Sequence, residues 1–247
     1  MEYSYRAIVL GKRDIADVDR LYTFYSLEGG LLCVSARGVR KVTAKLAAHL
    51  ETFVEAHVLV ARRRGSGTII SAVTENAYPV FRRDVLALGE LFWVADQFLR
   101  MVSFDDVDER LFFLYRSFLS TVEDISARSG LSESRRGDLY RLISLSFLFH
   151  TLSLLGYDLS FLRCAVSGKS LSSCQSSCVF SPALGVVACG EYSGSFSDAI
   201  VVSDNTIKLL RLFANNSFSS LMRLHVDQHD LAQARRVYDT FFLWHFS

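Results

Sequence analysis

The sequence predicts an α+β protein in which a small closed β-barrel precedes a mostly α-helical region. Three observations predict this class. Segments that alternate and are rich in β-formers fill residues 1–78, apolar residues recur at helical intervals beyond them, and Pro79 marks the change of pattern. Half of the 247 residues are hydrophobic and 13% are aromatic, so the chain can bury a substantial core.

About five short strands are expected in the first third of the chain. Alternation is clear in "YSYRAIVLG", "GLLCVSARG" and "TFVEAHVLVARR", and "GTIISAVTENAY" follows a Gly-Ser-Gly hairpin signal. A short helix is expected from Lys45. Strands of this number and spacing suggest a small closed barrel.

Helices are expected from Pro79 onward, where the composition becomes acidic. Residues 79–163 carry apolar faces at helical spacing, and Gly156 is expected to end one of these helices. An irregular element follows at about 164–192, and the closing stretch is helical again. Helical pieces on both sides of an insert are expected to pack together, so we predict domains at 1–78 and 79–247.

Positive charge is concentrated in the barrel region. The formal net charge is only +1, but residues 1–83 hold 13 Lys/Arg against 8 Asp/Glu. Within "ARGVRKVTAKL", residues 36–46, four cations occur without an acid: Arg37, Arg40, Lys41 and Lys45. A solvated loop would explain an isolated charge run, whereas the local excess of charge favours a surface that binds a polyanion.

No pattern of catalytic residues is present, and we expect no enzyme activity. "SGKS" at 167–170 lacks the first glycine of a phosphate-binding loop, because Arg163 occupies that position. His225 and His229 have a zinc-compatible spacing without the glutamate of the protease motif, and an exposed helix surface explains them better. The sequence shows neither a membrane span nor a signal peptide, so we expect a cytoplasmic protein without a membrane partner.

The amino-terminal third resembles the RecO family of DNA repair proteins, which are recombination mediators. The resemblance lies in "YRAIVLGKRDIADVDRLYTFYS", "GGLLCVSARGVRK" and "LAAHLETF", in that order and spacing. Beyond about residue 80 it is thinner, and consists of a helical region, "FSPALGVVAC" in a cysteine-bearing insert, and a last helix containing "LWH".

The resemblance implies an OB-fold barrel followed by a helical domain with a small zinc-finger-like insert. It implies a non-enzymatic DNA repair and recombination protein that binds single- and double-stranded DNA and anneals complementary strands. The implied partners are RecR and single-strand-binding protein, and indirectly RecA. The expected DNA-binding residues are Arg20, Arg37, Arg40, Lys41, Lys45, Arg62, Arg63 and Arg64. Tyr22, Phe24 and Tyr25 are aromatics that could stack on bases, and a core position in a half-buried strand is the alternative, which is at least as well supported for Phe24.

The insert departs from the family pattern of two C-x-x-C zinc knuckles. Ser167 and Tyr192 stand three positions after Cys164 and Cys189, where the second cysteine of each knuckle belongs, so each knuckle has lost its second thiolate. Cys174 and Cys178 are alternative sulfur donors at an unusual spacing. Zinc therefore stays an open alternative, and we expect a metal-free protein without a cofactor.

A second function class stays open from the sequence. A basic barrel with aromatic residues would suit RNA as well as DNA, and an assembly scaffold is a further alternative.

Overall fold

The computed structural model of the protein describes residues 1–247 apart from 40–44, 63–66, 105, 158, 175–176 and 247. It contains two compact units, Met1–Ala127 and Arg128–Ser247. The first unit holds the barrel and two helices, and the second holds the other long helices and the cysteine-bearing insert. The domain boundary expected after residue 78 stays a prediction.

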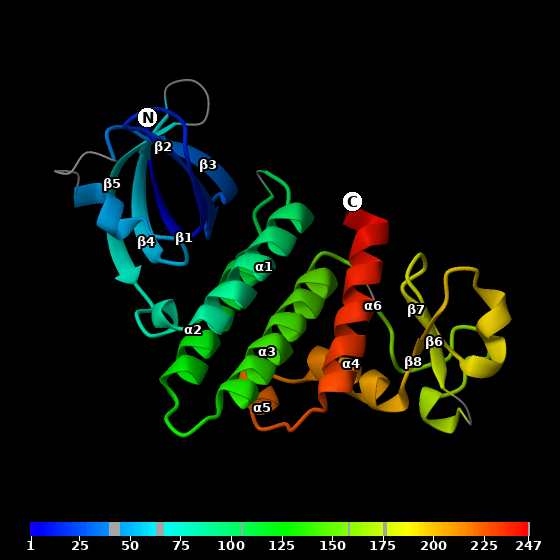
Figure 1. The fold of residues 1–247 in the computed structure, drawn as a ribbon. Coiled ribbons are helices and arrows are strands. Elements are labelled where there is room, and N and C mark those ends of the chain that lie inside the picture. Colours follow the sequence, from blue (N-terminus) through cyan, green and yellow to red (C-terminus); the bar gives the residue numbers. More distant parts are fainter. Residues whose placement is uncertain (40–44, 63–66, 105, 158, 175–176, 247) are drawn as a thin grey trace. The chain divides into compact units, whose positions relative to one another are not determined.

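Five strands form a closed barrel in the first unit (Figure 1). Their order around the barrel is β1-β2-β3-β5-β4. A 3₁₀-helix, η1 (Lys45–His49), follows β3 where the sequence predicts a short helix. The strands are β1 (Glu2–Asp14), β2 (Arg20–Ser26), β3 (Gly30–Ala36), β4 (Glu55–Ala61) and β5 (Thr68–Asn76).

The long first strand changes its partner along its length. Residues 7–14 pair with β2, whereas residues 2–8 pair with β4. Side chains of alternate residues, Tyr5, Ala7 and Val9, point into the barrel core. Residues 2–5 pair with β4 along one edge. Among the described strands, none pairs with their other edge, and we call this open edge of the barrel wall the seam.

Two long helices pack against the barrel within the first unit. They are α1 (Val85–Met101) and α2 (Glu109–Ala127), preceded by the 3₁₀-helix η2 (Phe81–Arg83). Pro79 was expected to open the helix, but α1 begins later because Asp84 caps it by accepting the amide hydrogens of Leu86 and Ala87. Phe98 of α1 contacts Tyr25 of β2 edge-to-face, with 5.1 Å between the ring centroids.

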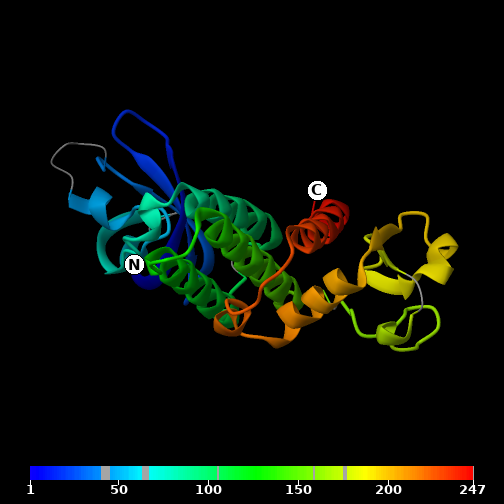
Figure 2. The same ribbon diagram turned by 60° about the horizontal axis from the view of Figure 1, so that its bottom comes forward.

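The second unit combines helices with a three-stranded sheet. Phe149 of α3 contacts Phe213 of α4 and Tyr238 of α6, which places one aromatic cluster among these three helices. In Figures 1 and 2 the sheet lies at one end of this unit, and α4 leads back from it toward α3. The helices are α3 (Glu133–Leu154), α4 (Asp204–Asn215), α5 (Phe218–Leu221) and α6 (Gln228–Phe246).

The sheet of the second unit has the order β7-β6-β8. It is the ordered core of the insert that the sequence predicts to be irregular. Its strands are β6 (Cys178–Ser181), β7 (Val186–Cys189) and β8 (Ile200–Val202), and the 3₁₀-helices are η3 (Leu171–Ser173) and η4 (Gly190–Ser195).

The barrel followed by a helical region confirms the predicted α+β class and the OB-type amino-terminal fold. In the described part of the chain, no helix is both long and apolar enough to cross a membrane.

Candidate nucleic-acid interface

Three of the predicted basic positions meet at one end of the barrel. Arg20 pairs with Ala36 in the β2–β3 ladder, so Arg20 and Arg37 are neighbours at the ends of adjacent strands. Ser35 pairs with Thr68, and Thr68 pairs with Ala61, the residue that precedes Arg62. The sheet register therefore brings Arg20, Arg37 and Arg62 to the same end of the barrel, although they are far apart in the sequence.

The turn that carries Arg37 is held by a neighbouring loop. Gly38 adopts a φ of 66°, a left-handed conformation that glycine tolerates best. Its amide donates a 2.7 Å hydrogen bond to Oδ1 of Asp19, in the loop between β1 and β2. Arg37 is exposed, and no described residue pairs with its side chain. The turn thus presents a free guanidinium to solvent.

Arg20 is only partly available for a ligand. Its Nε donates a 2.8 Å hydrogen bond to Oδ1 of Asp14, and this hydrogen bond raises the pKa of Arg20. A polyanion would have to share this arginine with Asp14. Arg13, on the same ladder, is exposed and was not among the predicted residues.

The other predicted cations lie wholly or partly outside the described residues. Arg40, Lys41, Arg63 and Arg64 belong to ranges that the structure does not describe, and of Lys45 only the backbone is described, as the first residue of η1. Their role in DNA binding stays a prediction.

The aromatics predicted to stack on bases are buried. Tyr22 and Phe24 belong to the barrel core, and Tyr25 packs against α1. Burial raises the pKa of Tyr25 to about 12, although its hydroxyl donates a hydrogen bond to the Asp108 carbonyl. This prediction was wrong, because β2 is covered on both faces, by the barrel core on one side and by α1 on the other.

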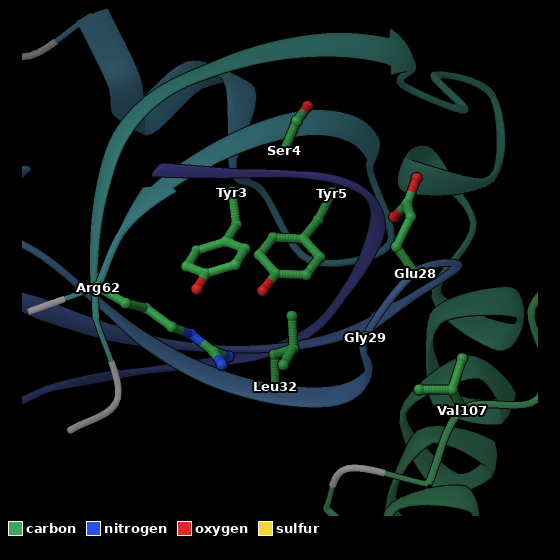
Figure 3. Close-up of a pocket in the computed structure, with 8 residues that line it drawn as sticks. All are labelled: Tyr3, Ser4, Tyr5, Glu28, Gly29, Leu32, Arg62 and Val107. Carbon is green, nitrogen blue, oxygen red and sulfur yellow. The ribbon is translucent and has the colours of Figure 1, made fainter. Parts of the chain in front are cut away.

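A pocket along the barrel wall, reaching from Arg62 to the β2–β3 turn, contains an aromatic pair that the sequence alone did not indicate (Figure 3). Its volume is about 380 Å³. The rings of Tyr3 and Tyr5 lie 6.4 Å apart and nearly parallel, and the Arg62 side chain reaches toward both from the end of β4. The signal was present in "YSY", because alternate residues of a strand share a face. The lining residues are Tyr3, Ser4, Tyr5, Glu28, Gly29, Leu32, Arg62 and Val107.

Backbone hydrogen bonds fix Arg62 at this pocket. The Arg62 amide donates to the Met1 carbonyl at 2.9 Å, and the Met1 amino group donates to the Arg62 carbonyl at 3.2 Å. These bonds extend the β1–β4 ladder by one residue pair. The Arg62 guanidinium carbon lies 5.8 Å from the centroid of each tyrosine ring, within the range of cation–π attraction.

Other cations of the first unit are neutralised by acids. Arg6 pairs with the buried Glu55 and with Glu75, and Arg116 of α2 also pairs with Glu55. Burial lowers the pKa of Arg6, but the two carboxylates outweigh this effect and raise it overall. Arg6 and Arg116 therefore stabilise the unit and are not available to an external anion.

Comparisons with known proteins cover nearly the whole chain. A family model described as recombination protein O N terminal matches residues 1–78, and one described as recombination protein O C terminal matches residues 98–247. The chain belongs to the recombination protein O (RecO) family.

Several members of this family are similar over most of the chain. A DNA repair protein RecO from Dehalococcoides mccartyi strain BAV1 is 27% identical over 94% of this chain and 86% of its own length. The protein of that name from Pelotomaculum thermopropionicum is 24% identical over 98% of this chain and 89% of its own length. The resemblance inferred from the barrel sequence is thus confirmed, and it extends through the helical region.

The cysteine-bearing insert of this RecO family member contains a disulfide. Cys174 is bonded to Cys189, and Cys164 Sγ accepts hydrogen bonds from the amides of Ser167 and Cys189. Burial opposes ionisation of Cys164, but these hydrogen bonds outweigh it and lower the pKa of the thiol to about 7. Cys178 Sγ instead lies 4.0 Å from the Asp204 carboxylate.

This arrangement of sulfurs does not fit a structural zinc ion. Such an ion takes four ligands, and two of the four sulfurs here are bonded to each other. Within the described ranges, no three His, Cys, Asp or Glu side chains are grouped so as to hold a metal. A metal-free protein stays our prediction.

Proposed function

We propose that this protein is a recombination mediator that binds single- and double-stranded DNA through the basic end of its barrel. In this proposal it anneals complementary strands in the cytoplasm and, together with RecR, helps RecA to replace single-strand-binding protein. It performs these steps by binding alone, without enzymatic chemistry and without a cofactor.

The convergence of Arg20, Arg37 and Arg62 at one end of the barrel carries this proposal. An OB-type barrel commonly binds nucleic acid near its inter-strand loops, and these arginines border the loops after β1, β3 and β4. Cations that neutralise phosphates release counterions, which favours binding to any sequence. The predicted cations at 40–45 and 63–64 directly follow Arg37 and Arg62 in the chain and would add to the same surface.

Annealing requires a protein that holds strands mainly by their backbones and leaves most of their bases free to pair. A backbone-binding surface meets this requirement because phosphate contacts carry no direct sequence information. The relatives named DNA repair protein RecO support a role in repair.

Annealing of complementary DNA strands coated with single-strand-binding protein tests the proposal. We expect the purified full chain to accelerate duplex formation on the coated strands, as measured with a donor and an acceptor dye on the two oligonucleotides. A rate equal to that without the protein would contradict the annealing function.

Matched DNA and RNA oligonucleotides in a gel-shift assay separate the competing classes. Tighter binding to RNA would favour the RNA-binding alternative, and binding to neither would favour a scaffold. Turnover of the nucleic acid during the assay would contradict the absence of enzymatic activity.

A further inference from the structure

We propose that the pocket formed by Tyr3, Tyr5 and Arg62 takes up one unstacked base of a single DNA strand, while the neighbouring arginines hold the phosphates. This inference rests on the proposed DNA-binding function. It adds a contact to a DNA base, which the basic residues alone do not provide. The pocket makes the barrel distinguish single strands from duplexes.

Tyr3 offers an exposed aromatic surface in this pocket. Tyr3 is 41% exposed, whereas Tyr5 behind it is only 7% exposed and belongs to the barrel core. The two rings differ in orientation by 24°, so Tyr5 supports Tyr3 from the protein side. A flat ligand can stack on such a platform, and stacking on an aromatic side chain is the usual way in which proteins hold single-stranded bases.

A hydrogen-bond donor of Arg62 lies unsatisfied beside the rings. The Arg62 Nε is buried, and it has no hydrogen-bond partner among the described residues. A buried N–H without a partner is costly, so a ligand gains affinity if it draws the Arg62 side chain toward it and offers an acceptor. Base carbonyls and ring nitrogens are such acceptors.

The opposite wall of the pocket carries the negative charge of Glu28. Glu28 also lines the pocket, and one of its carboxylate oxygens accepts a 2.8 Å hydrogen bond from the Arg6 amide. A carboxylate disfavours a phosphate inside the pocket, but it can accept a hydrogen bond from a base amino group. The combination of two rings, a donor and an acceptor therefore fits a neutral heteroaromatic base better than a free anion.

Local structure keeps the pocket open. The seam in the barrel wall leaves the edge of residues 2–5 without a neighbouring strand, so Tyr3 is not covered. Gly29 lines the opposite side, where an added Cβ would lie 2.8 Å from Cε1 of Tyr5. A volume of about 380 Å³ lies within the range of small-ligand pockets.

A duplex cannot use this pocket in the same way, because its bases are paired and stacked on each other. Removing the aromatic ring should therefore weaken binding to single strands and leave duplex binding unchanged. This selectivity distinguishes a base contact from a general loss of the fold.

The test compares Tyr3→Leu, Tyr3→Phe and wild-type full-length protein by fluorescence polarisation with a single-stranded oligonucleotide and with its duplex. We expect Tyr3→Leu to weaken single-strand binding about tenfold, as befits the loss of one stacked base, with unchanged duplex binding. Tyr3→Phe keeps the ring and should bind like the wild type. Phe113→Leu is the matched control, because Phe113 is 44% exposed and lies on α2 of the same unit.

A 2-aminopurine base in the single strand gives a second readout. Its fluorescence should be quenched by the wild type and less so by Tyr3→Leu at saturating protein. Equal single-strand affinity of Tyr3→Leu and wild type, or an equal loss on single strand and duplex, would overturn the inference while leaving the DNA-binding function standing. Failure of the wild type to bind either form would instead contradict the proposed function itself.

Discussion

Glu55 illustrates how a single residue joins the barrel to a helix. It lies in β4, its side chain is fully buried, and it pairs with Arg6 of β1 at 2.9 Å and with Arg116 of α2 at 3.2 Å. A buried carboxylate is costly unless it is paired, and here the two arginines supply the compensating charge. Removing the carboxylate would leave Arg6 and Arg116 to share Glu75.

We predict that Glu55→Ala lowers the free energy of unfolding by about 1.5–3 kcal/mol, the usual value of hydrogen bonds to charged groups, because the partly exposed Arg6 and Arg116 keep Glu75 as a partner. Urea unfolding followed by circular dichroism measures this change. The control is Glu51→Ala, because Glu51 is half exposed and pairs with Lys12 at the surface. That substitution should cost less than about 1 kcal/mol. Equal losses of unfolding free energy in the two variants would show that the Glu55 ion pairs stabilise the protein no more than the surface pair of Glu51.

Tyrosine exposure shows which residue-scale features the sequence can predict. Alternation in β2 correctly places Tyr22 and Phe24 on one face, but alternation does not say whether that face meets solvent or core. Both are buried because the barrel closes around them. Tyr3 is the exposed ring instead, since the first half of β1 lies at the seam of the wall.

At the scale of elements, the strands and long helices follow from periodicity, whereas their ends depend on local hydrogen bonds. Residues 1–78 carry the predicted barrel pattern, and all five strands lie there. The start of α1 at Val85 was misplaced because the Asp84 cap outweighs the signal of Pro79. The meeting of Arg20, Arg37 and Arg62 could not be predicted from their spacing, because it depends on the strand order of the closed barrel.

The insert provides a prediction about metal. We expect protein purified without a chelator to contain much less than one zinc per chain, because the Cys174–Cys189 disulfide uses two of the four sulfur donors. Elemental analysis by plasma mass spectrometry measures the zinc content. A stoichiometric zinc ion that is released by Cys174→Ser would contradict this prediction. It would show that Cys174 and Cys189 are reduced in the purified protein.

The segment at residues 36–46 provides a prediction about DNA. Replacing Arg37, Arg40, Lys41 and Lys45 together by Ala should strongly reduce both DNA affinity and the annealing rate. The fold should persist, because exposed substitutions usually change stability by only a few tenths of a kcal/mol. Filter binding with one oligonucleotide and thermal unfolding of the same samples measure the two effects.

Four exposed cations of the second unit form the matched control: Arg128, Lys208, Arg223 and Arg236. Their replacement by Ala removes the same charge from a different surface and should change DNA affinity far less. A larger loss in this control than in the barrel variant would place the DNA-binding face outside the barrel.

At the scale of the whole molecule, a net charge of +1 conceals a local excess of cations in the barrel region. A nearly neutral protein gains little from long-range attraction to DNA, so the proposed DNA binding requires phosphates that touch this local surface. The proposed mediator role agrees with such a division of charge, because a mediator would have to bind DNA of any sequence.

The salt dependence of single-strand affinity tests this account most directly. Neutralisation of about four to seven phosphates predicts a slope of roughly −3 to −5 for the logarithm of affinity against the logarithm of salt concentration. Oligonucleotides of different sequence should give the same slope. The variant that lacks the four cations of residues 36–46 should give a slope flatter by about 0.7 per lost contact. An affinity that does not change with salt, or a variant with the wild-type slope, would contradict binding of the DNA backbone by the basic end of the barrel.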